Sequence, residues 1–201
     1  MDLLKGQLTN GVLETLTSQL GGGATPSQTQ GAASSIMEVL LGGVARNAAS
    51  PEGAIALNNA LEKDHDGGIL DNLQDILGGR HVPPNQDRVL NGAGILKHIL
   101  GNKQSSIVDA ISKSNGLNTN QTSNLMIKLA PLLLGVLGKQ KRKEGLDVSG
   151  LSDLLGGARR QQEQQQSSSP IGGMLKNLLD QDGDGNIMDD VAGMLGRFMK
   201  K

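Results

Sequence analysis

Aliphatic residues recur at helical spacing through most of this chain, and glycines separate one run from the next. The first run places apolar side chains at steps of four, at Leu4, Leu8, Val12, Leu16 and Leu20. This spacing puts the side chains on one face of an amphipathic helix, and the glycines at 21–23 end that helix. The pattern predicts an all-α fold, a multihelical array in which each helix buries one stripe.

The core of such an array has to be aliphatic. Phe198 is the only aromatic residue among 201, and the chain contains no Trp, Tyr or Cys. The lack of cysteine excludes disulfides, thiolate metal sites and cysteine nucleophiles. A formal charge of -1, from 19 basic and 20 acidic residues, gives no overall attraction for nucleic acid or an anionic membrane. We therefore expect no nucleic-acid partner.

Helix-start signals divide the first half of the chain. Thr25 to Gln28 form a capping box with a proline at the first helical position, and the helix should run to about Ala45. Ser50-Pro51-Glu52 repeats the signal for a helix that ends near Leu61. Shorter helices are expected between glycines and other breaks, at 67–79, 92–101 and 105–114.

A second capping box, Asn118 to Gln121, stands 93 positions after the first. The same offset pairs Gly23 with Gly116 and Leu41 with Leu134. We interpret this as a degenerate duplicated helical unit, an internal repeat whose two copies pack in one core. Pro131 lies inside the second long helix and should kink it or split it in two.

The composition changes after Gly157. Residues 158–169 are rich in Gln and Ser, which predicts a linker that is flexible or at most a solvated helix. The expected organisation is an all-helical domain at 1–157, this polar linker, and a helix-loop-helix unit at 170–201.

Three strings carry a family resemblance: LLGGVARNAASPEGA at 40–54, GILKHILGNKQ at 94–104 and LAPLLLG at 129–135. They resemble the YidB-like bacterial proteins of unknown function, domain family nine hundred and thirty-seven. The similarity covers roughly residues 1–157, and members often end in a comparable Asp-Gly-Asp-Gly segment. The resemblance implies an all-helical fold and a bacterial source, and it implies no reaction.

One motif near the C-terminus carries metal chemistry. Asp180, Asp182 and Asp184 match positions 1, 3 and 5 of an EF-hand-like or dockerin-like loop. Gly185 follows at the sharp bend, and Asn186 would contribute its carbonyl. Alternate side chains of such a loop converge on one hard cation, so calcium is the expected cofactor.

The same loop departs from the EF-hand pattern at its end. The twelfth position, where an EF-hand supplies a bidentate Glu, is Val191. Asp189 and Asp190 would close a shortened loop instead, with a dissociation constant of about 10⁻⁴ to 10⁻³ M. The alternative is a polar turn in which Asp189 or Asp190 caps the last helix.

The histidines and the basic residues suggest no second site. His65, His81 and His98 lack any recognised metal spacing, and we interpret them as loop or surface residues. Asp64-His65-Asp66 fits a metal site and a helix-start turn equally well. The basic run at 139–143 is interpreted as a solvated helix end.

The chain shows no membrane or export signal. The longest apolar stretch, 129–138, is about half the length of a membrane-spanning helix, so no transmembrane segment is expected. Without a secretory signal, a cytoplasmic location is the default and non-classical export the alternative.

These features favour a non-enzymatic binding or scaffold protein with no catalytic residues. Its helical body would contact a protein partner or associate with itself, and its C-terminal loop would bind calcium weakly. A self-assembling structural protein is the first alternative. An enzyme, the less favoured alternative, would place a polar pocket between the two repeats near His65 or His98.

Overall fold

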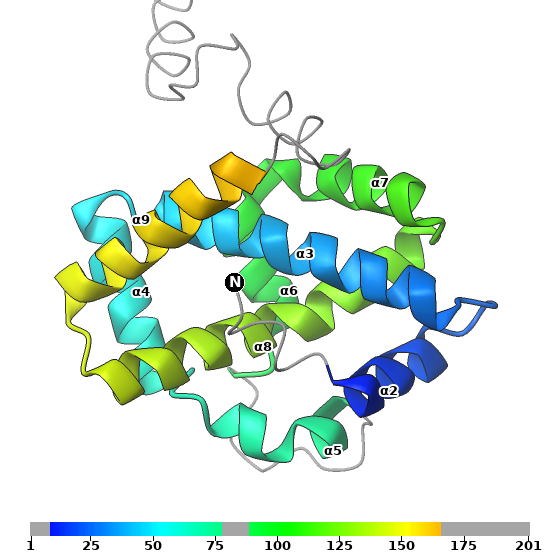
Figure 1. Ribbon diagram of the computed structural model, residues 1–201, viewed down its shortest axis with the longest axis horizontal. Helices are drawn as coiled ribbons and strands as arrows, with labels where there is room; N and C mark the ends of the chain where they lie inside the picture. The colour runs from blue at the N-terminus through cyan, green and yellow to red at the C-terminus, as the bar shows by residue number, and fades with distance from the viewer. Residues whose placement is uncertain (1–8, 78–88, 166–201) are drawn as a thin grey trace, which may run out of the picture. The chain divides into compact units, whose positions relative to one another are not determined.

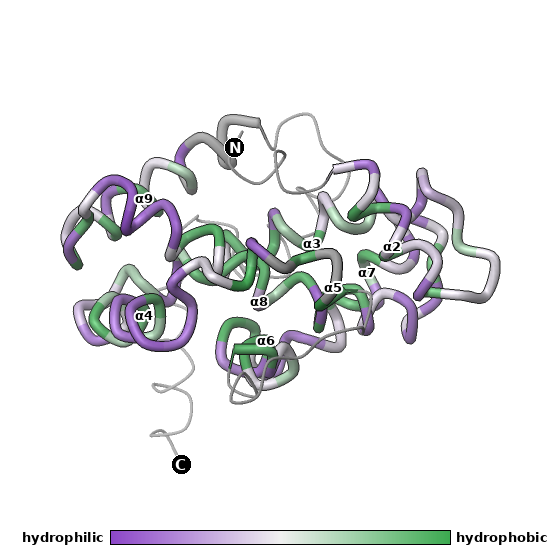
Figure 2. The backbone as a smooth tube through the Cα atoms, turned by 90° about the horizontal axis from the view of Figure 1, so that it is seen from below, coloured by the Kyte–Doolittle hydropathy of each residue, from purple (hydrophilic) through white to green (hydrophobic). Residues whose placement is uncertain are grey.

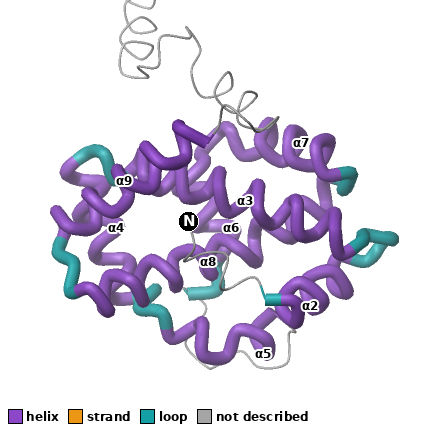
Figure 3. The backbone as a smooth tube through the Cα atoms, viewed as in Figure 1, coloured by secondary structure: helices purple, strands orange, loops and turns teal. Residues whose placement is uncertain are grey.

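The computed structural model describes residues 9–77 and 89–165. Within them every regular element is a helix, as Figure 3 shows, which confirms the predicted all-α, multihelical array. Contacts divide the chain into a unit at 1–162 and a second at 163–201. The predicted helix-loop-helix at 170–201 lies outside the described residues.

Two long helices form the centre of the first unit. α3 (Pro26–Asn47) packs on α8 (Thr119–Glu144), and α6 (Gly92–Leu100) contacts both. Figure 1 shows the remaining helices around them. These are α2 (Asn10–Leu20), α4 (Pro51–Lys63), η1 (Gly68–Asn72), α5 (Leu73–Leu77), η2 (Gly101–Lys103), α7 (Gln104–Asn115) and α9 (Val148–Gln165).

The core is aliphatic, as the composition requires. Figure 2 shows the apolar residues concentrated in α3, α6 and α8, with hydrophilic stretches on α4 and α9. The Leu, Met and Ala side chains of α8 that are at most 1% exposed are Leu125, Met126, Leu129, Ala130, Leu132 and Leu133. The predicted stripe of α3 is buried as well, at Ala33, Ile36, Leu40, Leu41 and Val44.

Both predicted capping boxes form, at the starts of α3 and α8. Each box glutamine also reaches the turn before the other helix. The Nε2 of Gln28 donates to the carbonyl of Gly116 at 2.8 Å, and the Nε2 of Gln121 donates to the carbonyl of Gly21 at 2.8 Å. These reciprocal bonds join the two helix starts. The internal repeat itself stays a prediction.

α8 runs unbroken from Thr119 to Glu144, so the alternative in which Pro131 splits the helix is wrong. Proline has no N–H, and it leaves the carbonyl of Ile127 without its helical donor. Gly92 of α6 lies directly against that carbonyl, since a β-carbon there would stand 1.8 Å from the Ile127 oxygen. Packing against α3, α6 and α7 keeps α8 helical despite the lost bond.

α9 continues to Gln165 and includes residues 158–165 of the predicted linker. Leu151 and Leu155 are its buried anchors, each 1% exposed. The helical alternative for this part of the polar tract is therefore the one observed, while the domain boundaries stay a prediction. None of the described helices is both long and apolar enough to cross a bilayer.

Candidate functional site

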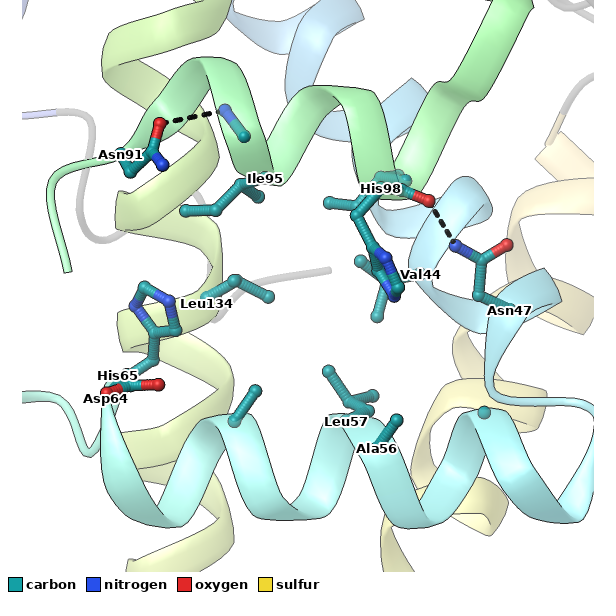
Figure 4. Close-up of a pocket in the computed structure, with 14 residues that line it drawn as sticks. Val44, Asn47, Ala56, Leu57, Asp64, His65, Asn91, Ile95, His98 and Leu134 are labelled. Atoms are coloured by element: carbon teal, nitrogen blue, oxygen red, sulfur yellow. Dashed lines mark hydrogen bonds between the residues drawn. The ribbon is translucent and has the colours of Figure 1, made fainter. Parts of the chain in front are cut away.

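A cavity of about 410 Å³ opens between α4 and α6, with α3 and α8 contributing to its lining. Figure 4 shows the two helices facing each other across it. Its aliphatic lining residues are Val44, Ala56, Leu57, Ala60, Ile95, Ile99 and Leu134. A cavity of this volume, mainly apolar with a few polar groups, is typical of a site for a small organic molecule.

Local turns hold the two walls in place. Ser50 caps α4, because its hydroxyl accepts from the Gly53 N–H at 3.1 Å. Asn91 caps α6 in the same way, accepting from the Gly94 N–H at 2.9 Å. The side chain of Asn47, at the end of α3, donates to the carbonyl of His98 at 3.2 Å. This last bond ties α3 to the α6 wall.

His65 stands just after α4 and lines the cavity. The residue is 5% exposed, and its Nδ1 is fully buried with no hydrogen-bond partner among the described residues. Burial lowers the pKa of this imidazole, and the neighbouring Asp64 carboxylate only partly opposes that effect. The ring is therefore neutral at pH 7 and carries an unpaired polar atom in the protein interior.

Other polar side chains lie at the ends of the cavity (Figure 4). Asp64 and Asn91 lie near His65, while His98 and Asn47 lie at the opposite end. Asp64 is the C-cap of α4, and its carboxylate has no hydrogen bond or salt bridge within the described residues.

The predicted calcium ligands cannot be compared with the structure. Asp180, Asp182, Asp184, Asn186, Asp189 and Asp190 all lie outside the described residues. Within the residues that the structure does describe, no group of three His, Asp or Glu side chains is placed to hold a metal. The loop therefore stays a prediction from the sequence.

The histidines are distributed differently from the prediction. His98 is exposed on α6, in agreement with a surface residue, and His81 lies outside the described residues. His65 lies in the loop after α4, in agreement with a loop residue, but its side chain is buried and not on the surface. The turn after it matches the helix-start interpretation, because the Asp66 carboxylate accepts from the Gly68 N–H at 2.9 Å.

Sequence reasoning missed two polar residues of the cavity. Asn91 stands directly before the Gly92-Ala93-Gly94 helix start, and its position as an N-cap was a usable signal. Asn47 had no such signal, because its partner His98 is 51 residues away and only the packing of α3 on α6 brings them together.

Asp64, His65 and His98 are the titratable side chains among the described residues that line the cavity. Among the described residues around the cavity there is no Ser, Thr, Lys or Tyr that would act as a nucleophile. No hydrogen bond joins His65 to Asp64, so the two do not form an oriented acid–base pair. The enzymatic alternative expected a polar pocket between the two repeats near His65 or His98, and the cavity beside these two residues is mainly aliphatic.

Comparison with known proteins gives a family and no activity. No curated protein and no solved structure matches the chain. The sequence profile of one family matches residues 2–140, which includes α2 to α7 and most of α8. The chain therefore belongs to the family described as bacterial protein of unknown function (DUF937).

Proposed function

We propose that this protein is a non-enzymatic binding protein that takes a small, mainly aliphatic molecule into the cavity between α4 and α6. The observation that carries the proposal is the buried, unpaired His65 imidazole beside an aliphatic cavity. An unsatisfied buried polar atom costs roughly 1–3 kcal/mol, so a group that forms a hydrogen bond with it stabilises the complex. A ligand hydroxyl that forms a hydrogen bond with Nδ1 would offset that cost, and the aliphatic walls would contact the hydrocarbon part of the ligand.

The wild-type chain provides the test. n-Hexanol, a neutral short-chain alcohol, is titrated while the methyl NMR signals of Leu57, Ile95 and Leu134 are followed. We expect saturable shifts of these three signals, because their side chains line the cavity. Methyl groups of α7, such as those of Ile107, should not respond.

A pair of variants on α4 distinguishes the cavity from the general surface. Ala56→Trp places an indole at the exposed rim of the cavity, and Asn59→Trp places one at an exposed position of the same helix that does not line it. The first should abolish the hexanol shifts and the second should leave them unchanged. Equal shifts in both variants, or none in the wild type, would refute the proposal.

We also propose, from the sequence alone, that the loop at 180–190 binds calcium weakly. Calorimetry on the full chain should give a saturable heat with a dissociation constant of about 10⁻⁴ to 10⁻³ M. Asp180→Ala removes the first ligand and should eliminate the heat, whereas Asp153→Ala, an exposed position on α9, should not. A calcium titration into the millimolar range without heat would leave only a capped turn.

Location decides whether that loop is occupied. A site this weak is empty in a low-calcium cytoplasm, which is the location that we propose, and it is filled outside the cell. Association with a protein partner or with a second copy of the chain is a further role proposed for the helical body. Light scattering over a wide concentration range tests self-association, and a constant monomer mass would refute it.

A further inference from the structure

The cavity has two polar ends with hydrocarbon between them. Asp64 and His65 lie at the end where α4 finishes, and Asn47 and His98 lie at the other, as Figure 4 shows. Between the ends the lining is aliphatic, with Leu134 from α8 among its residues. An elongated molecule with one polar head fits this distribution better than a compact polar one.

The end formed by Asp64 carries a negative charge that no basic side chain of the described residues pairs with. The acidic residues on either side of it are paired, Glu62 with Lys141 at 2.8 Å and Asp66 with Arg142 at 3.1 Å. Asp64 has no such partner within the described residues. It also caps the C-terminus of α4, the negative end of the helix dipole.

The other charged groups close to this end do not compensate. Burial keeps the His65 imidazole neutral by lowering its pKa. Lys63, Lys97 and Lys139 are exposed and do not line the cavity. His98 is at the far end. The described residues therefore leave one carboxylate facing a partly apolar cavity, where an opposite charge is worth more than in water.

We propose that the ligand is a short primary alkylamine, with its ammonium group on the Asp64 carboxylate and its hydrocarbon chain against the aliphatic lining. This inference rests on the proposed binding function and names the chemistry of the ligand. A carboxylate ligand of the same length is excluded, because it would bring a second negative charge to Asp64.

Three probes with one chain length test the head group. n-Hexylamine, n-hexanol and hexanoate are titrated separately into the full-length wild type at neutral pH, with the cavity methyl signals as the readout. Because a charge-assisted hydrogen bond is worth about 1–2 kcal/mol more than a neutral one, the amine should bind about tenfold more tightly than the alcohol. Hexanoate should bind more weakly than either.

Asp64→Asn removes the charge and keeps the shape. It should lower the affinity for hexylamine about tenfold, to the level of hexanol, and leave the affinity for hexanol unchanged, which also shows that the cavity is intact. Asp109→Asn, the same change at an exposed position of α7, should alter nothing. A second readout needs no variant: added salt should weaken binding of the amine to the wild type and not that of the alcohol.

Each result separates the two proposals. If hexanol binds in the cavity but hexylamine binds no more tightly, or if Asp64→Asn leaves the hexylamine affinity unchanged, the amine is wrong and the binding function stands. If none of the three probes shifts the cavity signals, the binding function fails together with the amine.

Discussion

Replacing Gly138 by alanine should destabilise the protein, although alanine is the better helix former. Gly138 lies in α8 and packs against the backbone just after α4. A β-carbon there would stand 1.8 Å from the carbonyl oxygen of His65 and 3.2 Å from the carbonyl carbon of Asp66. Both neighbours are backbone atoms, so no side chain can rotate away to make room.

The size of the effect follows from the overlap. An ordinary contact begins at 3.4 Å, so α8 and the segment at His65 must separate by roughly 1.6 Å (3.4 − 1.8). Overpacking in a core costs about 1–3 kcal/mol, and an overlap with rigid backbone falls at the upper end. The higher helix propensity of alanine relative to glycine stabilises the variant by about 1 kcal/mol. The expected net loss is about 2 kcal/mol, which corresponds to a fall in Tm of about 4–8 °C for a chain of this length.

Thermal unfolding followed by far-ultraviolet circular dichroism measures this loss, and Gly156→Ala is the matched control. Gly156 also lies inside a helix, α9, but a β-carbon there meets nothing within 4 Å. The control should raise the free energy of unfolding by up to about 1 kcal/mol. The reasoning is refuted if both alanine variants unfold at or above the wild-type temperature. Gly138→Ala should also weaken hexanol binding, since it displaces His65 at one end of the cavity.

Three further predictions concern polar contacts. Gln121→Ala should lower the free energy of unfolding by about 1–2 kcal/mol, and this loss should exceed that of Gln28→Ala because Gln121 is only 7% exposed. Urea unfolding of the two variants compares the losses, and equal losses would contradict the argument from burial. Thr122→Val removes the buried hydrogen bond of 2.8 Å that the Ser112 hydroxyl donates to Thr122. In the same assay this variant should lose about 1 kcal/mol of unfolding free energy, and an unchanged urea midpoint would contradict that expectation. Burial lowers the pKa of the His65 imidazole in the folded protein. Below about pH 6.5, His65 therefore binds a proton more readily in the unfolded chain than in the folded one. The free energy of unfolding of the wild type should therefore fall as the pH drops below about 6.5. Urea titrations at several pH values should show a smaller fall for His65→Gln, and parallel curves for the two proteins would show that His65 is not the group responsible.

Local signals predicted the helices because the interactions that start and stop a helix span only a few residues. Thr25 and Gln28 mark the start of α3, and Asn118 and Gln121 mark the start of α8. In each pair the two residues are three positions apart. The aliphatic stripes were equally readable, because the helical period itself decides which face is buried.

The unbroken helix at Pro131 is a feature that the neighbouring residues in the sequence do not predict. Proline in isolation disfavours a helix interior, and the sequence offered a kink or a split. The helix continues because Gly92 and the rest of α6 pack on that part of α8, together with α3 and α7. Such contacts between residues far apart in the sequence cannot be inferred from the neighbours of Pro131.

The sequence by itself determined the helical class, the starts of α3, α4 and α8, the aliphatic nature of the core and the family. Only the tertiary structure decided that His65 is buried rather than on the surface, and that Asn47, Asp64 and His98 line one cavity. The physical reason is that a cap or a stripe depends on residues within one or two turns, whereas a cavity depends on how helices cross. Here the close approaches at Gly53, Gly92 and Gly138 set that crossing, and each is defined by a backbone contact with another segment.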